Sequence, residues 1–284
     1  MGRSSSMTTT WKSFLIRSTS ALIALALVVG LYLYMDVKGV KIAVTFAIII
    51  GTWELMTVLF NEEPSWFLKF SFLVFSLLTF GSCCLVLNIG ILVFALSIIL
   101  LCVFSLLSLH KSASLERIFQ FQARAAMGLF YMGLLPAFAY RLLDVMQGLS
   151  WFVFLLLVVF AGDVFAYVFG MLLGKHKVMP AVSPKKTWQG SVGGISGSIL
   201  AGLVCWIYLL SNFDVWFILG LSAVSGFIAQ FGDFFESLLK RVANVKDSGK
   251  IMPGHGGVLD RIDGVLFASP VVLFGVVFLS HFLS

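Results

Sequence analysis

The segment QFGDFFESLLKRVANVKDSGKIMPGHGGVLDRID, residues 230–263, concentrates charge in a chain that is otherwise apolar. It contains five basic and five acidic side chains: Lys240, Arg241, Lys246, Lys250, Arg261, Asp233, Glu236, Asp247, Asp260 and Asp263. Anchoring at a membrane surface needs a few Lys or Arg but no carboxylates. The combination therefore indicates a site where a metal ion and basic side chains hold a polyanion.

The composition on either side of this segment predicts a membrane protein. Of the 284 residues, 60% are hydrophobic and only 11% are charged, whereas a soluble domain has about a quarter of its residues charged. Backbone groups in lipid must be hydrogen-bonded within each span, and the apolar runs are continuous rather than alternating. We therefore expect an all-α integral membrane protein and exclude a transmembrane β-barrel.

Nine apolar runs are long enough to cross a bilayer, which needs about 20 residues. They are residues 14–35, 40–60, 66–82, 84–108, 122–143, 150–173, 190–211, 214–239 and 262–283. The first run is longer than a signal-peptide core and no small-residue cleavage site stands out, so we expect a retained helix. We divide the chain into N-terminal hydrophobic helices, 1–110, and a catalytic membrane region, 111–284.

The distribution of basic residues orients these spans. With nine spans, 16 of the 19 Lys and Arg fall on one side, and this bias predicts a cytoplasmic N-terminus and an outside C-terminus. The loops 174–190 and 240–262 then share the cytoplasmic side. The net charge of +6 suits anionic lipid rather than nucleic acid. We expect a protein of the cytoplasmic membrane whose active site faces the cytoplasm.

Two pairs of carboxylates lie at the ends of the last two spans. Asp233 and Glu236, and likewise Asp260 and Asp263, have the i, i+3 spacing of one helical face. If they converge, their oxygen atoms suit Mg²⁺, and Asp163 inside the sixth span could add a ligand. Simpler roles remain open: a Glu236–Lys240 salt bridge, helix capping by the second pair, and a structural partner for Asp163.

Two cytoplasmic loops have features of phosphate-binding segments. In the first, Pro253-Gly254-His255-Gly256-Gly257, glycines allow close backbone approach, and His255 is a candidate proton donor. In the second, Ser183 followed by Pro184 predicts the start of a helix whose first turn holds Lys185 and Lys186. Such an N-terminus would favour an anion, although simple membrane anchoring by the two lysines is an alternative. The following glycines, 190, 193, 194 and 197, predict close helix packing.

Three motifs, with their spacing kept, resemble the signature of the phosphatidate cytidylyltransferases (CDP-diacylglycerol synthases). They are Ser237-Leu238-Leu239-Lys240-Arg241, Lys246-Asp247-Ser248-Gly249 and Pro253 through Asp263. Ser183 through Trp188 and the Asp163 segment resemble the same family, over about residues 120–284. Gln189 departs from it, since Glu is expected there.

This resemblance implies transfer of the cytidylyl group of CTP to phosphatidate, giving CDP-diacylglycerol and pyrophosphate for phospholipid biosynthesis, with Mg²⁺ and a second cation left open. Asp233, Asp260 and Asp263 would hold the metal, with Asp163 or Glu236 as an additional ligand. The expected phosphate-binding and substrate-binding residues are Lys185, Lys186, Lys240, Arg241, Lys246, Asp247, Gly256, Gly257 and Arg261. Membrane lipid is an expected partner, and a homodimer is left open.

Two other classes of protein also use acidic residues in membranes. A cation-coupled transporter would need ionisable groups along a path across the bilayer, whereas most of those here lie at one face. A CDP-alcohol phosphotransferase would also use aspartates and Mg²⁺, but its D-G-x-x-A-R pattern is missing from the sequence.

Overall fold

The structure is a computed structural model that describes residue 19 and residues 22–23, 25–63, 65–111, 113–245, 247–249 and 256–283. Within these residues the chain is an all-α integral membrane protein with no strand longer than an isolated bridge. Its helices are α2 (Val37–Leu59), α3 (Trp66–Leu85), α4 (Leu87–Leu109), α5 (Leu115–Gly128), the π-helical η1 (Leu129–Leu134), α6 (Leu135–Leu142), α7 (Gly148–Leu173), α8 (Trp188–Tyr208), α9 (Val215–Val242) and α10 (Leu259–Leu283).

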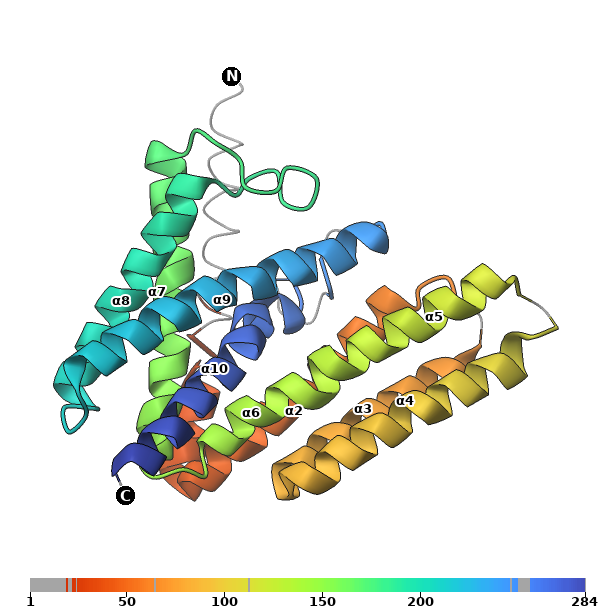
Figure 1. The fold of residues 1–284 in the computed structure, drawn as a ribbon, viewed down its shortest axis with the longest axis horizontal. Coiled ribbons are helices and arrows are strands. Elements are labelled where there is room, and N and C mark those ends of the chain that lie inside the picture. The colour runs from red at the N-terminus through yellow and green to blue at the C-terminus, as the bar shows by residue number, and fades with distance from the viewer. Residues whose placement is uncertain are drawn as a thin grey trace.

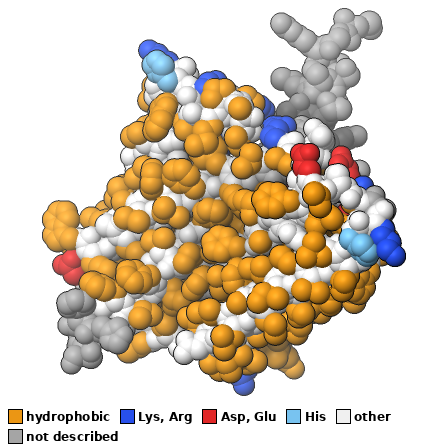
Figure 2. All heavy atoms as spheres, turned by 45° about the vertical axis from the view of Figure 1, so that its right-hand side comes forward, with side chains coloured by type: hydrophobic (Ala, Val, Ile, Leu, Met, Phe, Trp, Pro, Cys, Tyr) orange, Lys and Arg blue, Asp and Glu red, His pale blue; other side chains and the backbone are white. Residues whose placement is uncertain are grey.

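Eight helical segments in the described part of the chain are long and apolar enough to cross a membrane. They match the last eight predicted spans, including the division between 66–82 and 84–108, where Val86 separates α3 from α4. Part of the predicted span 14–35 lies outside the described residues, and within its described part Leu25–Met35 is a short apolar helix. Hydrophobic side chains cover most of the face shown in Figure 2, and charged side chains gather mainly at its edges.

The fifth span begins earlier than its hydrophobicity predicts. It runs from Leu115 to Leu142 as α5, η1 and α6 in series. The Ser114 hydroxyl accepts the Arg117 N–H and caps the first turn, so the mixed-charge segment that precedes 122 belongs to this helix. Toward the C-terminal end of this span, Pro136 lies in the first turn of α6 and has no N–H to donate. The π-helical turn η1 directly precedes it.

The helices form two packed groups that share α9 and α10. The α3–α4 hairpin lies beside the α5–η1–α6 span, and the α7–α8 hairpin stands on the other side of the molecule (Figure 1). One buried cluster centres on α2, α3 and η1 and includes Leu239 and Leu259. The other includes Trp151 and Val158 of α7 and Val272 of α10. The division of the chain at residue 110 stays a prediction.

Candidate functional site

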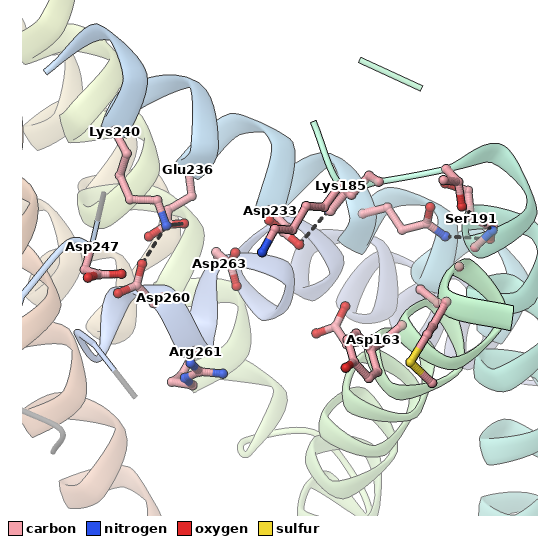
Figure 3. Close-up of a pocket in the computed structure, with 18 residues that line it drawn as sticks. Asp163, Lys185, Ser191, Asp233, Glu236, Lys240, Asp247, Asp260, Arg261 and Asp263 are labelled. Atoms are coloured by element: carbon pink, nitrogen blue, oxygen red, sulfur yellow. Dashed lines mark hydrogen bonds and ion pairs between the residues drawn. The ribbon is translucent and has the colours of Figure 1, made fainter. Parts of the chain in front are cut away.

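A cavity of about 610 Å³ opens among α7, α8, α9, α10 and the segment between α7 and α8. Most of its polar lining is charged (Figure 3). The charged residues that line it are Asp163, Asp233, Glu236, Asp247, Asp260, Asp263, Lys185, Lys186, Lys240 and Arg261. The structure thus brings together side chains that are up to 100 residues apart in the sequence.

The crossing of α9 and α10 sets the centre of this cavity. A side chain at Gly232 would overlap the backbone carbonyl of Asp263, so the glycine allows the two helices to approach closely there. Asp233 and Asp263 are therefore neighbours on the cavity wall. The predicted convergence of the two carboxylate pairs is confirmed as a spatial arrangement, whereas their role as metal ligands stays a prediction.

At one end of the cavity, Lys240 forms ion pairs with carboxylates of both α9 and α10. Its Nζ donates to Asp260 Oδ1 at 2.6 Å and also pairs with Glu236, one helical turn away. The other oxygen of Asp260, Oδ2, accepts the N–H of Gly257 at 2.8 Å and the N–H of Ser248 at 3.2 Å. The anticipated Glu236–Lys240 salt bridge is therefore present, and Asp260 organises the loop before its helix.

Lys186 lies toward the other end, against α9. Its Nζ is 2.5 Å from Asp233 Oδ2 and 4.2 Å from the centre of the Phe234 ring. The neighbouring Lys185 is exposed and also lines the cavity. Lys185 and Lys186 therefore line the same cavity as the carboxylates of α9, as the shared side of the two loops predicted.

Asp163 lies on the wall formed by α7. Ten residues separate it from the end of that helix at Leu173, which places it roughly 15 Å along the axis. The glycine face of α8 packs closely on α7, with Gly194 against Gly162 and Ala166, so the predicted close packing is confirmed. Asp163 thus faces the cavity from one of two tightly joined helices (Figure 3).

The start of α8 differs from its prediction. The helix begins at Trp188 with Thr187 as its N-cap, whose hydroxyl accepts the Gly190 N–H at 3.2 Å. An isolated bridge between Lys177 and Thr187 keeps the preceding residues out of the helix. Lys185 and Lys186 therefore precede the cap, and the expectation that they occupy the first helical turn is wrong, although both reach the cavity.

Gln189, the departure from the family pattern, stabilises a turn. Its Oε1 accepts the N–H of Lys175 at 3.1 Å and the N–H of His176 at 3.4 Å. An amide oxygen makes these contacts without a negative charge. Gln189 is also absent from the lining of the charged cavity. The departure therefore leaves the acidic set of that cavity intact.

Some predicted site residues lie elsewhere. Arg241 is exposed, and its Nε donates to the carbonyl of Val182 at 3.4 Å rather than lining the cavity. Gly256 and Gly257 border Asp260 and are not part of the cavity wall. His255 and Lys246 lie outside the described residues. The roles given to these residues stay predictions.

One buried acidic residue at this end of the molecule was not predicted as part of the site. Glu54 of α2 is buried, and its Oε2 accepts the Leu259 N–H at 2.9 Å. Residues 1–110 were expected only to form N-terminal hydrophobic helices. The available signal was an acidic residue inside an apolar span, which is unfavourable unless it has partners.

Fold and cavity together define a polytopic α-helical membrane protein with a charged site at one end of its helices. A sequence profile described as the cytidylyltransferase family matches residues 15–279. The chain belongs to this family.

Several similar proteins are named phosphatidate cytidylyltransferase. One from Staphylococcus saprophyticus is 38% identical over 178 residues, which is 63% of this chain and 65% of that protein. One from Staphylococcus aureus is 39% identical over 51% of this chain and 55% of its own length. One from Staphylococcus epidermidis is 44% identical over 44% of this chain and 48% of its own length. The chain therefore matches between about half and two thirds of each relative.

Proposed function

We propose that this chain transfers the cytidylyl group of CTP to phosphatidate. A phosphate oxygen of phosphatidate bonds to the α-phosphorus of CTP, and the bond from that phosphorus to the oxygen bridging the β-phosphorus breaks. The products are CDP-diacylglycerol and pyrophosphate. The observation that carries the proposal is the cavity itself, where basic side chains and carboxylates gather at one end of membrane-spanning helices. The names of the similar proteins point to the same reaction.

The basic side chains of the cavity suit the phosphates of both substrates. Lys185 and Lys186 approach from the α7–α8 segment, and Arg261 from the first turn of α10. Nucleotidyl transfer, like phosphoryl transfer, depends mainly on positioning and on neutralising charge. Phosphate oxygens would compete with Asp233 for Lys186, because that ion pair is partly exposed to solvent. A phosphate monoester is largely ionised near neutral pH, so the reaction needs no strong general base.

The donor set of the cavity fits Mg²⁺. Six carboxylates against four basic side chains leave a formal charge of −2, which would repel two anionic substrates unless a cation balances it. Oxygen ligands are those that Mg²⁺ prefers, with water and phosphate in the remaining positions. Among the described residues no three His, Cys, Asp or Glu side chains already form a metal-binding group. Asp233, Asp260 and Asp263 would hold the ion, with Asp163 or Glu236 in addition. A bound Mg²⁺ would neutralise charge on the phosphates.

The exposed face of α7 offers a lateral entrance for a lipid. Tyr167 and Met171 line the cavity and are also exposed on the outside of that helix. A phosphatidate headgroup could reach the basic side chains from there while its acyl chains stay in the bilayer. The excess of Lys and Arg at the loops of this end supports a site at the cytoplasmic face of the cytoplasmic membrane. CTP would then enter from the cytoplasm.

The proposal is tested with purified protein in detergent micelles. With CTP, Mg²⁺ and phosphatidate, we expect pyrophosphate and CDP-diacylglycerol in equal amounts, and none when phosphatidate is left out. Failure of CTP to be consumed would overturn the proposal. Release of CMP from CDP-diacylglycerol with an alcohol acceptor would instead indicate the phosphotransferase class. Near-normal turnover in Asp260→Asn would show that the metal assignment is wrong.

A further inference from the structure

Glu54 is a carboxylate enclosed within the protein, 3% exposed, near the end of the apolar helix α2. Burying an ionisable side chain at membrane depth is costly, and a leucine would fill the same space without that cost. The contacts of Glu54 are therefore expected to serve a purpose beyond packing.

Those contacts lie on the loop between α9 and α10 and on the first residue of α10. Glu54 Oε2 accepts the N–H of Leu259, 205 residues further along the chain. Side chains at Gly249 or Gly257 would overlap the Glu54 carboxylate, so both glycines leave space for it. The hydroxyl of Ser248 also borders Gly257. The carboxylate thus lies against Gly249 and Gly257 of the loop and against Leu259, the first residue of α10.

The first turn of α10, which follows this loop, carries Asp260. Asp260 Oδ2 accepts the N–H of Ser248 and the N–H of Gly257, and Leu259, whose N–H reaches Glu54, is the adjacent residue. Two carboxylates therefore accept backbone N–H groups from this loop and from the start of α10. Asp260 faces the cavity, whereas Glu54 is absent from its lining. Any effect of Glu54 on the reaction is therefore indirect and acts through this loop and the start of α10.

We propose that Glu54 is a positioning residue, which fixes Gly249, Gly257 and the start of α10 so that Asp260 and Asp247 face the cavity in a reactive arrangement. The proposal rests on the proposed function for its catalytic consequence. In this proposal Gly249 and Gly257 of the signature segment have a structural role: neither has a side chain that would overlap the Glu54 carboxylate of α2. The first third of the chain thereby contributes to a site that otherwise consists of later helices.

The test compares substitutions that separate hydrogen bonding from packing. Glu54→Gln keeps an oxygen that accepts the Leu259 N–H, whereas Glu54→Leu keeps similar volume without an acceptor. Glu62→Gln is the matched control, since Glu62 is exposed just beyond the same helix. We expect Glu54→Leu to lower kcat for pyrophosphate release at least about 30-fold with less than about threefold change in KM for CTP, because small misplacements of a reacting geometry can cost as much as 10²-fold. Glu54→Gln should stay within about fivefold of the parent protein, and Glu62→Gln within about twofold.

A second measurement does not depend on turnover. Hydrogen–deuterium exchange of the micelle-solubilised chain should show peptides covering 247–259 exchanging about tenfold faster in Glu54→Leu, while peptides of α7 and α8 stay unchanged. If the parent protein releases no pyrophosphate, the proposed function fails and this exchange still tests Glu54. Equal kinetics in the Gln and Leu variants, or unchanged loop exchange, would overturn the proposal.

Glu54→Leu could fail to fold, so a conservative variant completes the design. Glu54→Asp keeps the charge but is one methylene shorter and should no longer reach Leu259. We expect the same loop-specific rise in exchange in a variant that elutes as the parent does on size-exclusion chromatography. Unchanged exchange in Glu54→Asp would count against a positioning role.

Discussion

Lys240 and Lys186 line the same cavity and each pairs with a carboxylate of α9, but their surroundings differ. The Lys240 side chain is 16% exposed, and its partners Glu236 and Asp260 are 3% and 10% exposed. Lys186 is 26% exposed and its partner Asp233 is 37% exposed. Figure 3 shows Lys240 between its two carboxylates at one side of the site, and Asp233 nearer the centre.

The difference in burial changes what each ion pair can do. A buried pair has lost its hydration, so removing one partner leaves an uncompensated charge. A partly exposed pair is worth only about 0–1 kcal/mol because water screens and replaces it. The Lys240 group is therefore suited to holding the loop before α10 in place. The Lys186–Asp233 pair is suited to opening, so that each member can bind another charged group.

The largest effect is expected from Lys240→Met, which keeps an unbranched side chain but removes the charge. Glu236 and Asp260 would then face each other without a cation, and breaking a buried pair costs about 3–5 kcal/mol. The variant should lose most of its thermal stability in micelles. The measurement is the fraction of protein that remains monodisperse after a temperature ramp. Lys185→Met is the matched control, because Lys185 is exposed, and should melt close to the parent protein. Equal melting of the two variants would contradict the distinction between buried and exposed lysines.

Most of the fold could be predicted because its determinants are local. Apolar runs of about 20 residues define the spans, although the predicted division at residue 83 lies three residues before the observed break at Val86. The start of α8 was misplaced because two local signals compete. Ser183 followed by Pro184 is a valid helix start, but the bridge between Lys177 and Thr187 imposes an extended segment first. That bridge is a tertiary contact which helix-start signals do not encode.

The candidate site was predicted only in part, because local patterns reveal some of its residues but not their tertiary contacts. The i, i+3 carboxylate pairs reveal which side chains share a helical face, and topology reveals which loops share a side. Neither shows which residue of an apolar span will contact the start of a helix 205 positions away, as Glu54 does. The sequence also does not predict every ion pair. The i, i+4 spacing makes Glu236 an obvious partner for Lys240, whereas the contact of Lys240 with Asp260 depends on how α9 and α10 cross.

Asp233→Asn is expected to have a smaller effect on stability than Lys240→Met, but a large effect on turnover. The change removes the charge of an exposed pair, so the melting behaviour should shift by no more than about 1 kcal/mol in stability. Turnover should fall at least about 100-fold, equivalent to about 2.7 kcal/mol, because Asp233 lies at the centre of the cavity as a proposed metal ligand. Pyrophosphate release and the temperature ramp, measured on one preparation, separate the two effects. A large loss of stability with retained turnover would place Asp233 with the structural group around Lys240.

The smallest effect is expected at Phe234, whose ring lies 4.2 Å from Lys186 Nζ. A cation over an aromatic ring at a partly exposed site gains about 0.5–1 kcal/mol. Phe234→Leu keeps an apolar side chain but frees the lysine, so we expect the KM for CTP to rise about two- to fivefold with little change in kcat. Phe227→Leu, one ring away from this contact and exposed on α9, should leave KM unchanged. If both variants behave alike, the ring does not hold Lys186. The contrast with Lys240 would then rest on burial and on the number of carboxylate partners, which is two for Lys240 and one for Lys186.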